Sequence, residues 1–306
     1  MAKKTCITKK TYSAGFDKSK IYTYINLLRY YKNNKNLAEN DFKIFSEIKN
    51  IFDKYTNKKI SESRLLEIGC GQHFTMTLLF YNIGAKITGI DTDFVSPSYS
   101  PKNLYKIIKN NGFERFLKTL IRHIFFDRKY YSVIKKKLNR DLFFKGIDIR
   151  LMDACNLTFS NKLFDFIFSN AVFEHIYDVD KASKEIHRVL KDDGIIYITI
   201  DLFTSISGGH NLSWADPHTK NVKKNIAPPW DHLRNNLYPT HVYLNQLSEK
   251  DYIEIFSNYF DIIEIDYDYE GEEFLTDYII DELKSKFSKD ELLKKRVKFL
   301  LKKRNC

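Results

Sequence analysis

The hydrophobic pattern divides most of the chain into short apolar runs separated by stretches with helical spacing. Within residues 178–190, for example, apolar residues recur every three or four positions, which is typical of a helix with one buried face. Strands alternating with helices predict a parallel sheet covered on both faces, and right-handed crossovers make it doubly wound. The predicted strands are 64–68, 85–90, 147–152, 164–169, 195–200 and 260–267.

Helical patterns also occur outside this alternation. Residues 17–55 predict two N-terminal helices, separated by a polar segment at 31–40. Residues 101–144 predict helices between the second and third strands, and 296–302 fits either a strand or the end of a helix. The expected organisation is a helical extension (1–60), an α/β domain (61–306) and, within that domain, a helical insert (95–145).

Positive charge is concentrated in the predicted insert. Between Pro101 and Arg150 there are 14 Lys or Arg and 4 Asp or Glu, a balance of +10 within a whole-chain charge of +11. Such a segment could bind nucleic acid, an anionic membrane surface or a phosphorylated substrate. The charge could equally reflect a compositional bias without function, because Lys, Asn, Ile and Tyr are frequent throughout the chain.

The remaining composition points to a reduced, cytoplasmic protein. The four cysteines form no CxxC pair and fit neither a disulfide framework nor a zinc motif. We expect no signal peptide and no membrane span, because no apolar stretch follows the N-terminus and no apolar run is long enough.

A glycine turn and three polar residues follow successive predicted strands. The Gly69-Cys70-Gly71 turn would let a ligand approach the backbone, and the next helix would offer free N–H groups. A dinucleotide site expects a third glycine where Phe74 stands, which argues against NAD. Asp91, Asp153 and Asn170 end the second, third and fourth strands. Each acid alone could be a helix cap, but the set favours a ligand site at the carboxyl edge of the sheet.

These motifs together resemble the class I S-adenosylmethionine (SAM)-dependent methyltransferase family over residues 62–202, with a weaker likeness at 258–303. Leu66-Glu67-Ile68-Gly69-Cys70-Gly71 is similar to the family's first motif, and Gly89-Ile90-Asp91 to its second. The resemblance implies SAM as the cofactor. It also implies a Rossmann-like sheet of seven strands, mostly parallel with an antiparallel last strand, and so favours a strand at 297–302.

The resemblance further implies which residues contact the cofactor. The glycines would bracket its methionine part, Glu67 would face its amino group or orient the loop, and Asp91 would bind the ribose. The full expected set is Glu67, Gly69, Cys70, Gly71, Asp91, Thr92, Asp153, Ala154, Asn170 and Ala171. His73 would line the pocket or cap the following helix, and we favour capping.

Residues 203–247 are too long for a passive connection, and we expect them to form a substrate lid. Both tryptophans lie there and could stack on a sugar or a base. Methyl transfer to a hydroxyl needs a proton acceptor, which His can provide near neutral pH with Asp orienting it. The candidate catalytic residues are His210, His218 and Asp216, then His175 and His232. Their spacing matches no compact metal motif, so we predict no metal ligands.

The insert and lid more loosely resemble methyltransferases found with bacterial surface-polysaccharide genes. We therefore predict methylation of a small molecule or glycan precursor, most simply O-methylation of a sugar or of a phosphorylated or nucleotide-linked sugar. The basic insert suits an anionic substrate. One alternative is an RNA or other nucleic-acid methyltransferase, although the chain has no recognised RNA-binding module. The other alternative is a SAM-binding protein without activity.

Overall fold

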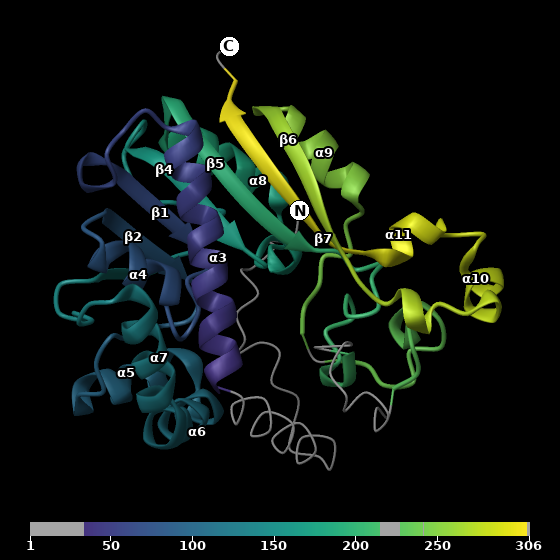
Figure 1. Cartoon of the computed structure of the whole chain (residues 1–306), viewed down its shortest axis with the longest axis horizontal. Coiled ribbons are helices and arrows are strands. Elements are labelled where there is room, and N and C mark those ends of the chain that lie inside the picture. The colour runs from purple at the N-terminus through teal and green to yellow at the C-terminus, as the bar shows by residue number, and fades with distance from the viewer. Residues whose placement is uncertain (1–33, 215–226, 241, 305–306) are drawn as a thin grey trace.

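The computed structural model describes residues 34–214, 227–240 and 242–304, which contain one seven-stranded sheet with the order β3-β2-β1-β4-β5-β7-β6 (Figure 1). The first five strands are parallel, and β7 runs antiparallel between β5 and β6. This arrangement confirms the predicted fold and shows that residues 296–302 are part of a strand. The strands are β1 (Arg64–Ile68), β2 (Lys86–Asp91), β3 (Asp148–Leu151), β4 (Phe164–Asn170), β5 (Leu190–Asp201), β6 (Phe260–Tyr269) and β7 (Lys294–Lys303).

Helices cover both faces of the sheet. In Figure 1, α3 (Asn34–Tyr55) crosses one face, while α8 (Val179–Val189) and α9 (Glu249–Ser257) lie behind the other. Strand β4 is apolar on both sides, since Phe166 and Phe168 pack toward α3 and Ile167 packs toward α8. A continuous apolar run is therefore required here, because the strand has no solvent-facing side.

Within the described residues, helix α3 covers Asn34–Tyr55 without interruption, so the predicted break within the polar segment is wrong for its described part. Ala38 lies in that segment and is fully buried, like Phe45, Ile48 and Phe52 further along. Ala38 and the partly buried Leu37 continue the buried face of the helix into the polar segment. The predicted helical residues 17–33 lie outside the described part of the chain.

The insert between β2 and β3 is helical, as predicted. It consists of α5 (Pro101–Asn111), α6 (Phe113–Arg122), a π-helical turn (His123–Asp127) and α7 (Arg128–Leu138). It is joined to the loop after β1, because Arg122 Nη2 donates to the Gln72 carbonyl at 3.1 Å. No helix in the described part of the chain is long and apolar enough to cross a membrane.

His73 contacts this insert and does not cap a helix. Its Nε2 lies 3.4 Å from Asp127 Oδ1, and its ring stacks on Tyr130 with the centroids 4.6 Å apart. The N-cap of α4 (Thr75–Asn82) is Phe74, which makes no side-chain cap. The predicted capping role is wrong because an insert residue distant in sequence supplies a buried carboxylate for the imidazole.

The segment after β5 has a small core of its own. Trp214 and Trp230 are buried there, packed with residues of α10 (Asp277–Leu283) and α11 (Lys289–Leu293). Each indole N–H donates to a backbone carbonyl, of Ala227 at 3.0 Å and of Thr204 at 3.1 Å. Neither ring can stack on a substrate, so that expectation is wrong. Both indoles instead satisfy apolar burial and hydrogen bonding within the fold.

Candidate functional site

The carboxyl ends of the central strands meet at one edge of the sheet. Ile68 at the end of β1 pairs with Ile90 of β2 and with Ser169 of β4. The Ser169 hydroxyl donates to the Ile68 carbonyl at 3.0 Å, which holds the two strand ends together. Asp91 pairs with Leu151 at the end of β3. The register therefore brings the predicted cofactor residues to one edge.

Asp91 is held directly beside the glycine turn. One of its carboxylate oxygens accepts the Gly71 N–H at 2.9 Å, and the other accepts the Asp93 N–H at 2.7 Å. These two backbone hydrogen bonds hold the carboxylate in place at the end of β2, next to the glycine turn. Thr92 follows Asp91 and is exposed.

The two glycines of the turn have different surroundings. Both have a left-handed backbone, with φ of +76° at Gly69 and +64° at Gly71. A Cβ on Gly69 would lie 2.3 Å from Val172 Cγ2, whereas a Cβ on Gly71 would meet nothing within 4 Å. The chain thus packs against one glycine and leaves open space beside the other. This space fits a ligand lying against the backbone.

Glu67 and Cys70 contribute to the turn from inside the protein. Glu67 is buried and accepts the Thr77 N–H at 2.7 Å and the Thr77 hydroxyl, so it ties β1 to α4. Burial raises the pKa of Glu67 to about 7. The Cys70 side chain packs in an apolar cluster with Phe74 and Leu78. Of the two predicted roles for Glu67, the geometry favours orienting the loop.

The remaining predicted cofactor residues follow β3 and β4. Asp153 Oδ1 accepts the Cys155 N–H at 2.9 Å, and Ala154 is buried between them. Asn170 Oδ1 accepts the Thr199 hydroxyl at 2.8 Å. Ala171 has φ of +53°, a conformation that L-residues rarely adopt, and it turns the chain away from β4.

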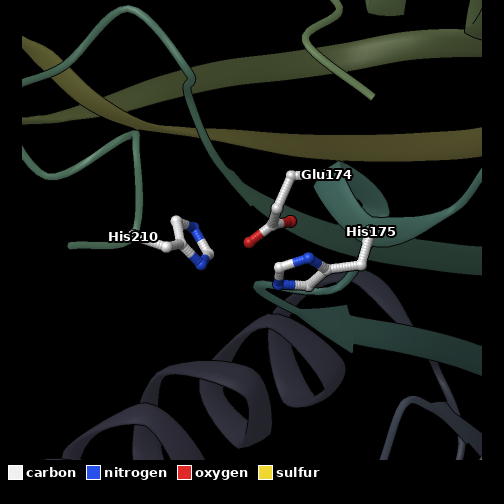
Figure 2. A group of neighbouring side chains, drawn as sticks. All are labelled: Glu174, His175 and His210. Atoms are coloured by element: carbon white, nitrogen blue, oxygen red, sulfur yellow. The ribbon is translucent and has the colours of Figure 1, made fainter. Parts of the chain in front are cut away.

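Two of the predicted catalytic histidines meet beyond this edge. His175 ends a short 3-10 turn after β4, and His210 lies in the loop after β5. Their ring centroids are 4.9 Å apart, and Figure 2 shows the Glu174 carboxylate reaching toward both rings. Burial and, to a smaller extent, the nearby His175 lower the pKa of His210 to about 4, so His210 is neutral at physiological pH.

A profile of a methyltransferase domain matches residues 39–259, most of the chain. The chain belongs to this methyltransferase family. It is an enzyme of the class I SAM-dependent type, and SAM is its cofactor. No curated protein matches the sequence significantly.

The methyltransferase also has similar solved structures. One is the PH0226 protein of Pyrococcus horikoshii OT3, with 15% identity over 86% of this chain and 90% of that chain, at a TM-score of 0.45. Another is the YcgJ protein of a Bacillus species, with 15% identity over 85% of this chain and 98% of that chain, at 0.45. A third is phosphoethanolamine N-methyltransferase 2 of Haemonchus contortus with bound SAM, with 17% identity over 85% of this chain and 53% of that chain, at 0.44.

The other predicted catalytic residues of the methyltransferase are placed differently. His232 Nε2 lies 2.8 Å from the Phe203 carbonyl oxygen. The His232 ring also packs closely on Gly209, since a Cβ added to Gly209 would lie 2.5 Å from His232 Cγ. His232 therefore supports the loop that carries His210. His218 and Asp216 lie outside the described residues. Glu174 was not predicted, although Phe173-Glu174-His175-Ile176, an acid within an apolar turn, carried a signal.

Proposed function

We propose that this methyltransferase transfers the methyl group of SAM to a hydroxyl of a small acceptor bound beside His175 and His210. SAM supplies a methyl group that is already activated on a sulfonium. The protein then has to orient the acceptor, exclude water and accept the hydroxyl proton.

The observation that carries this proposal is the meeting of the two histidines. His175 follows β4 and His210 follows β5, and these two strands are neighbours in the sheet. Both histidines come after the carboxyl ends of their strands, where Asn170 ends β4 at the edge that carries the predicted cofactor residues. His175 Nδ1 lies 2.8 Å from the Tyr243 carbonyl, and a carbonyl can only accept. The proton of a neutral His175 is therefore on Nδ1, and Nε2 carries the lone pair. His210, whose pKa is lowered to about 4, has a basic nitrogen at neutral pH.

The acceptor class that we propose is a sugar, or a phosphorylated or nucleotide-linked sugar, of the kind used as a glycan precursor. The basic insert supports an anionic acceptor, because its residues Lys102, Lys106 and Lys109 are exposed. The insert also contacts the glycine turn, because Arg122 donates a hydrogen bond to the Gln72 carbonyl. A second contact is an ion pair in which Arg115 Nη2 lies 3.1 Å from Oδ2 of the buried Asp93. Charge and location together favour a phosphate group near the methyl donor.

The test begins with calorimetric titration of the full chain with SAM, S-adenosylhomocysteine and NAD. We expect binding of both sulfur compounds and none of NAD. Sugar phosphates and nucleotide sugars are then incubated with SAM, and formation of S-adenosylhomocysteine is measured. His210→Ala should keep SAM affinity and lower turnover by about 10²–10⁴-fold. Its control, His187→Ala, changes a residue at the opposite end of the sheet, beside the start of β5.

The second candidate substrate is RNA or another nucleic acid, which the charge of the insert favours. A salt-dependent gel shift with single- and double-stranded RNA separates the two candidates, because phosphate contacts release counterions. Methylation of RNA, combined with no turnover on any sugar acceptor, would replace the proposed acceptor class.

A further inference from the structure

Glu174 is a buried carboxylate without a hydrogen-bond partner among the described residues. Its exposed fraction is 3%, and neither of its oxygens makes a hydrogen bond of ordinary geometry. Burial raises its pKa well above the usual range, and the nearby Asp201 raises it further, against smaller opposing effects of Arg296 and two backbone amides. An unpartnered acid is costly inside a protein, which indicates that the site has a ligand of its own.

The position of this carboxylate identifies the kind of ligand. One ligand atom each from Glu174, His175 and His210 lie within 4.8 Å of one another. Figure 2 shows the carboxylate reaching toward the two rings, which come from different loops. A zinc ion lies about 2.0–2.2 Å from imidazole and carboxylate ligands, which places its ligand atoms ~3.4 Å apart. Small side-chain rotations would therefore close the site around an ion.

Neighbouring residues hold the three proposed ligand residues in position through hydrogen bonds and packing. The backbone N–H of Asn245 donates to the Glu174 carbonyl at 2.9 Å, and its side-chain amide donates to the Phe173 and Ile176 carbonyls. The Tyr243 carbonyl fixes the tautomer of His175, as outer partners do for metal-bound histidines. His210 has φ of +54°, and its loop is supported by His232. Backbone strain of this kind is found where a side chain has to be aimed.

The local charge also favours a cation. Arg296 Nε donates to Asp201 Oδ1 at 2.7 Å, so this guanidinium is already paired with the acid next to Glu174. Glu174 lies between two imidazoles, and its burial disfavours the ionised carboxylate unless a cation lies beside it. Two histidines and one carboxylate are a common ligand set for first-row divalent metals, with other positions left open for water or substrate.

We propose that Glu174, His175 and His210 bind one divalent transition-metal ion beside the methyl donor. The proposal deepens the proposed function, because the acceptor hydroxyl would occupy an open position on the ion. The ion would lower the pKa of that hydroxyl, so its proton leaves to water while its oxygen takes the methyl group and S-adenosylhomocysteine is released. His210 would then be a ligand and not the base, since one lone pair cannot serve both roles.

The test uses full-length protein that has been treated with chelator and dialysed. Titration with Zn²⁺ and Mn²⁺, without SAM or acceptor, should show one bound ion per chain and a higher melting temperature. Mg²⁺ should bind more weakly, because it prefers oxygen ligands. Glu174→Gln and His210→Ala should each weaken binding by at least about tenfold, while the control His187→Ala should leave it unchanged. Circular dichroism checks that each variant is folded.

The result that would overturn the proposal is either no stoichiometric ion or equal affinity of wild type, Glu174→Gln and His210→Ala. Glu174→Gln adds a second criterion that needs no metal. The ion-free variant should be more stable than the ion-free wild type, and the order should reverse when the ion is added. Because metal binding is measured without SAM or acceptor, failure of this proposal is distinguishable from failure of the proposed methyl transfer.

Discussion

Gly69 and Gly71 share one backbone conformation but differ in what surrounds them, so their alanine variants should fail differently. Gly69→Ala should destabilise the fold by about 2–4 kcal/mol, because a methyl group there collides with Val172 and overpacking adds to left-handed strain. Gly71→Ala should cost only about 1 kcal/mol, because its Cβ enters open space. It should nevertheless weaken SAM binding, since that space is the proposed ligand position.

Urea unfolding and SAM titration of both variants measure this difference. The double variant Gly69→Ala with Val172→Ala should recover part of the lost stability, because it removes the colliding methyl groups. Equal stability of the two single variants would show that Val172 does not constrain the turn.

Glu67 should make stability depend on pH. Its pKa is about 7 in the folded protein against 4.5 ordinarily, so the folded state binds a proton more tightly than the unfolded chain. The free energy of unfolding should therefore fall as pH rises from about 4.5 to 7, and the loss is complete above that window. Glu67→Gln should remove this contribution and become relatively more stable across the same window.

Denaturant unfolding of wild type and Glu67→Gln at several pH values checks this expectation. The exposed Glu62 provides a matched Glu→Gln control. A stability difference between Glu67→Gln and wild type that stays constant with pH would contradict the predicted titration of Glu67.

At the residue scale, the sequence predicts positions that depend on strand ends and misses those that depend on distant partners. Gly71 and Asp91 could be located because parallel strands end at one edge, and the structure joins them by a hydrogen bond. The role of His73 could not be predicted, because Asp127 reaches it only through the packing of the insert. Glu174 was missed because only the loop after β5 brings His210 to it.

At the element scale, a buried charge cluster fastens the insert to the cofactor turn. Arg122 and Asp127 are 5% and 4% exposed, with Nε and Oδ1 3.2 Å apart, and Arg122 also holds the Gln72 carbonyl. Burial alone would raise the pKa of Asp127. Hydrogen bonding to His73 and the charge of Arg122 outweigh this effect and lower the pKa of Asp127 to about 2.

Asp127→Asn should therefore cost about 3–5 kcal/mol of stability, because it leaves Arg122 buried without a counter-charge. It should also weaken SAM binding, since the turn loses its support. Thermal unfolding and SAM titration provide the two measurements. Asp141→Asn, which changes an exposed ion pair with Lys135, should cost below about 0.5 kcal/mol. A similar small effect of Asp127→Asn would show that the insert is not held by this cluster.

The strands and the helices of the insert could be predicted from the sequence because the apolar residues of each recur with the spacing of a strand or a helix. Helices α10 and α11 could not, since they are short and complete a core whose other half lies far back in the sequence, at Ile206, Trp214 and Trp230. Their apolar residues bury only after that long-range packing has formed.

At the scale of the whole molecule, the protein has a core after β5 that is separate from the sheet's cores. Leu283 is 2% exposed in the former, and Leu66 is fully buried beside the sheet. Leu283→Ala should increase hydrogen exchange across 203–214 and 227–240 while leaving the sheet protected, as a local opening does. Leu66→Ala should lower protection throughout, at a cost of about 2–5 kcal/mol. Uniform loss of protection in both variants would show that the two cores unfold together.

The burial of Trp214 and Trp230 in one small core has an optical consequence. They are the only two tryptophans of the chain, and none lies in the sheet or in the described helices against it. Intrinsic fluorescence therefore reports on the region that carries His210, whereas far-ultraviolet circular dichroism reports mainly on the sheet and its helices. The native protein contains its own probe for the acceptor side, and a change in emission upon adding an ion, cofactor or acceptor would reveal rearrangement there without any attached label.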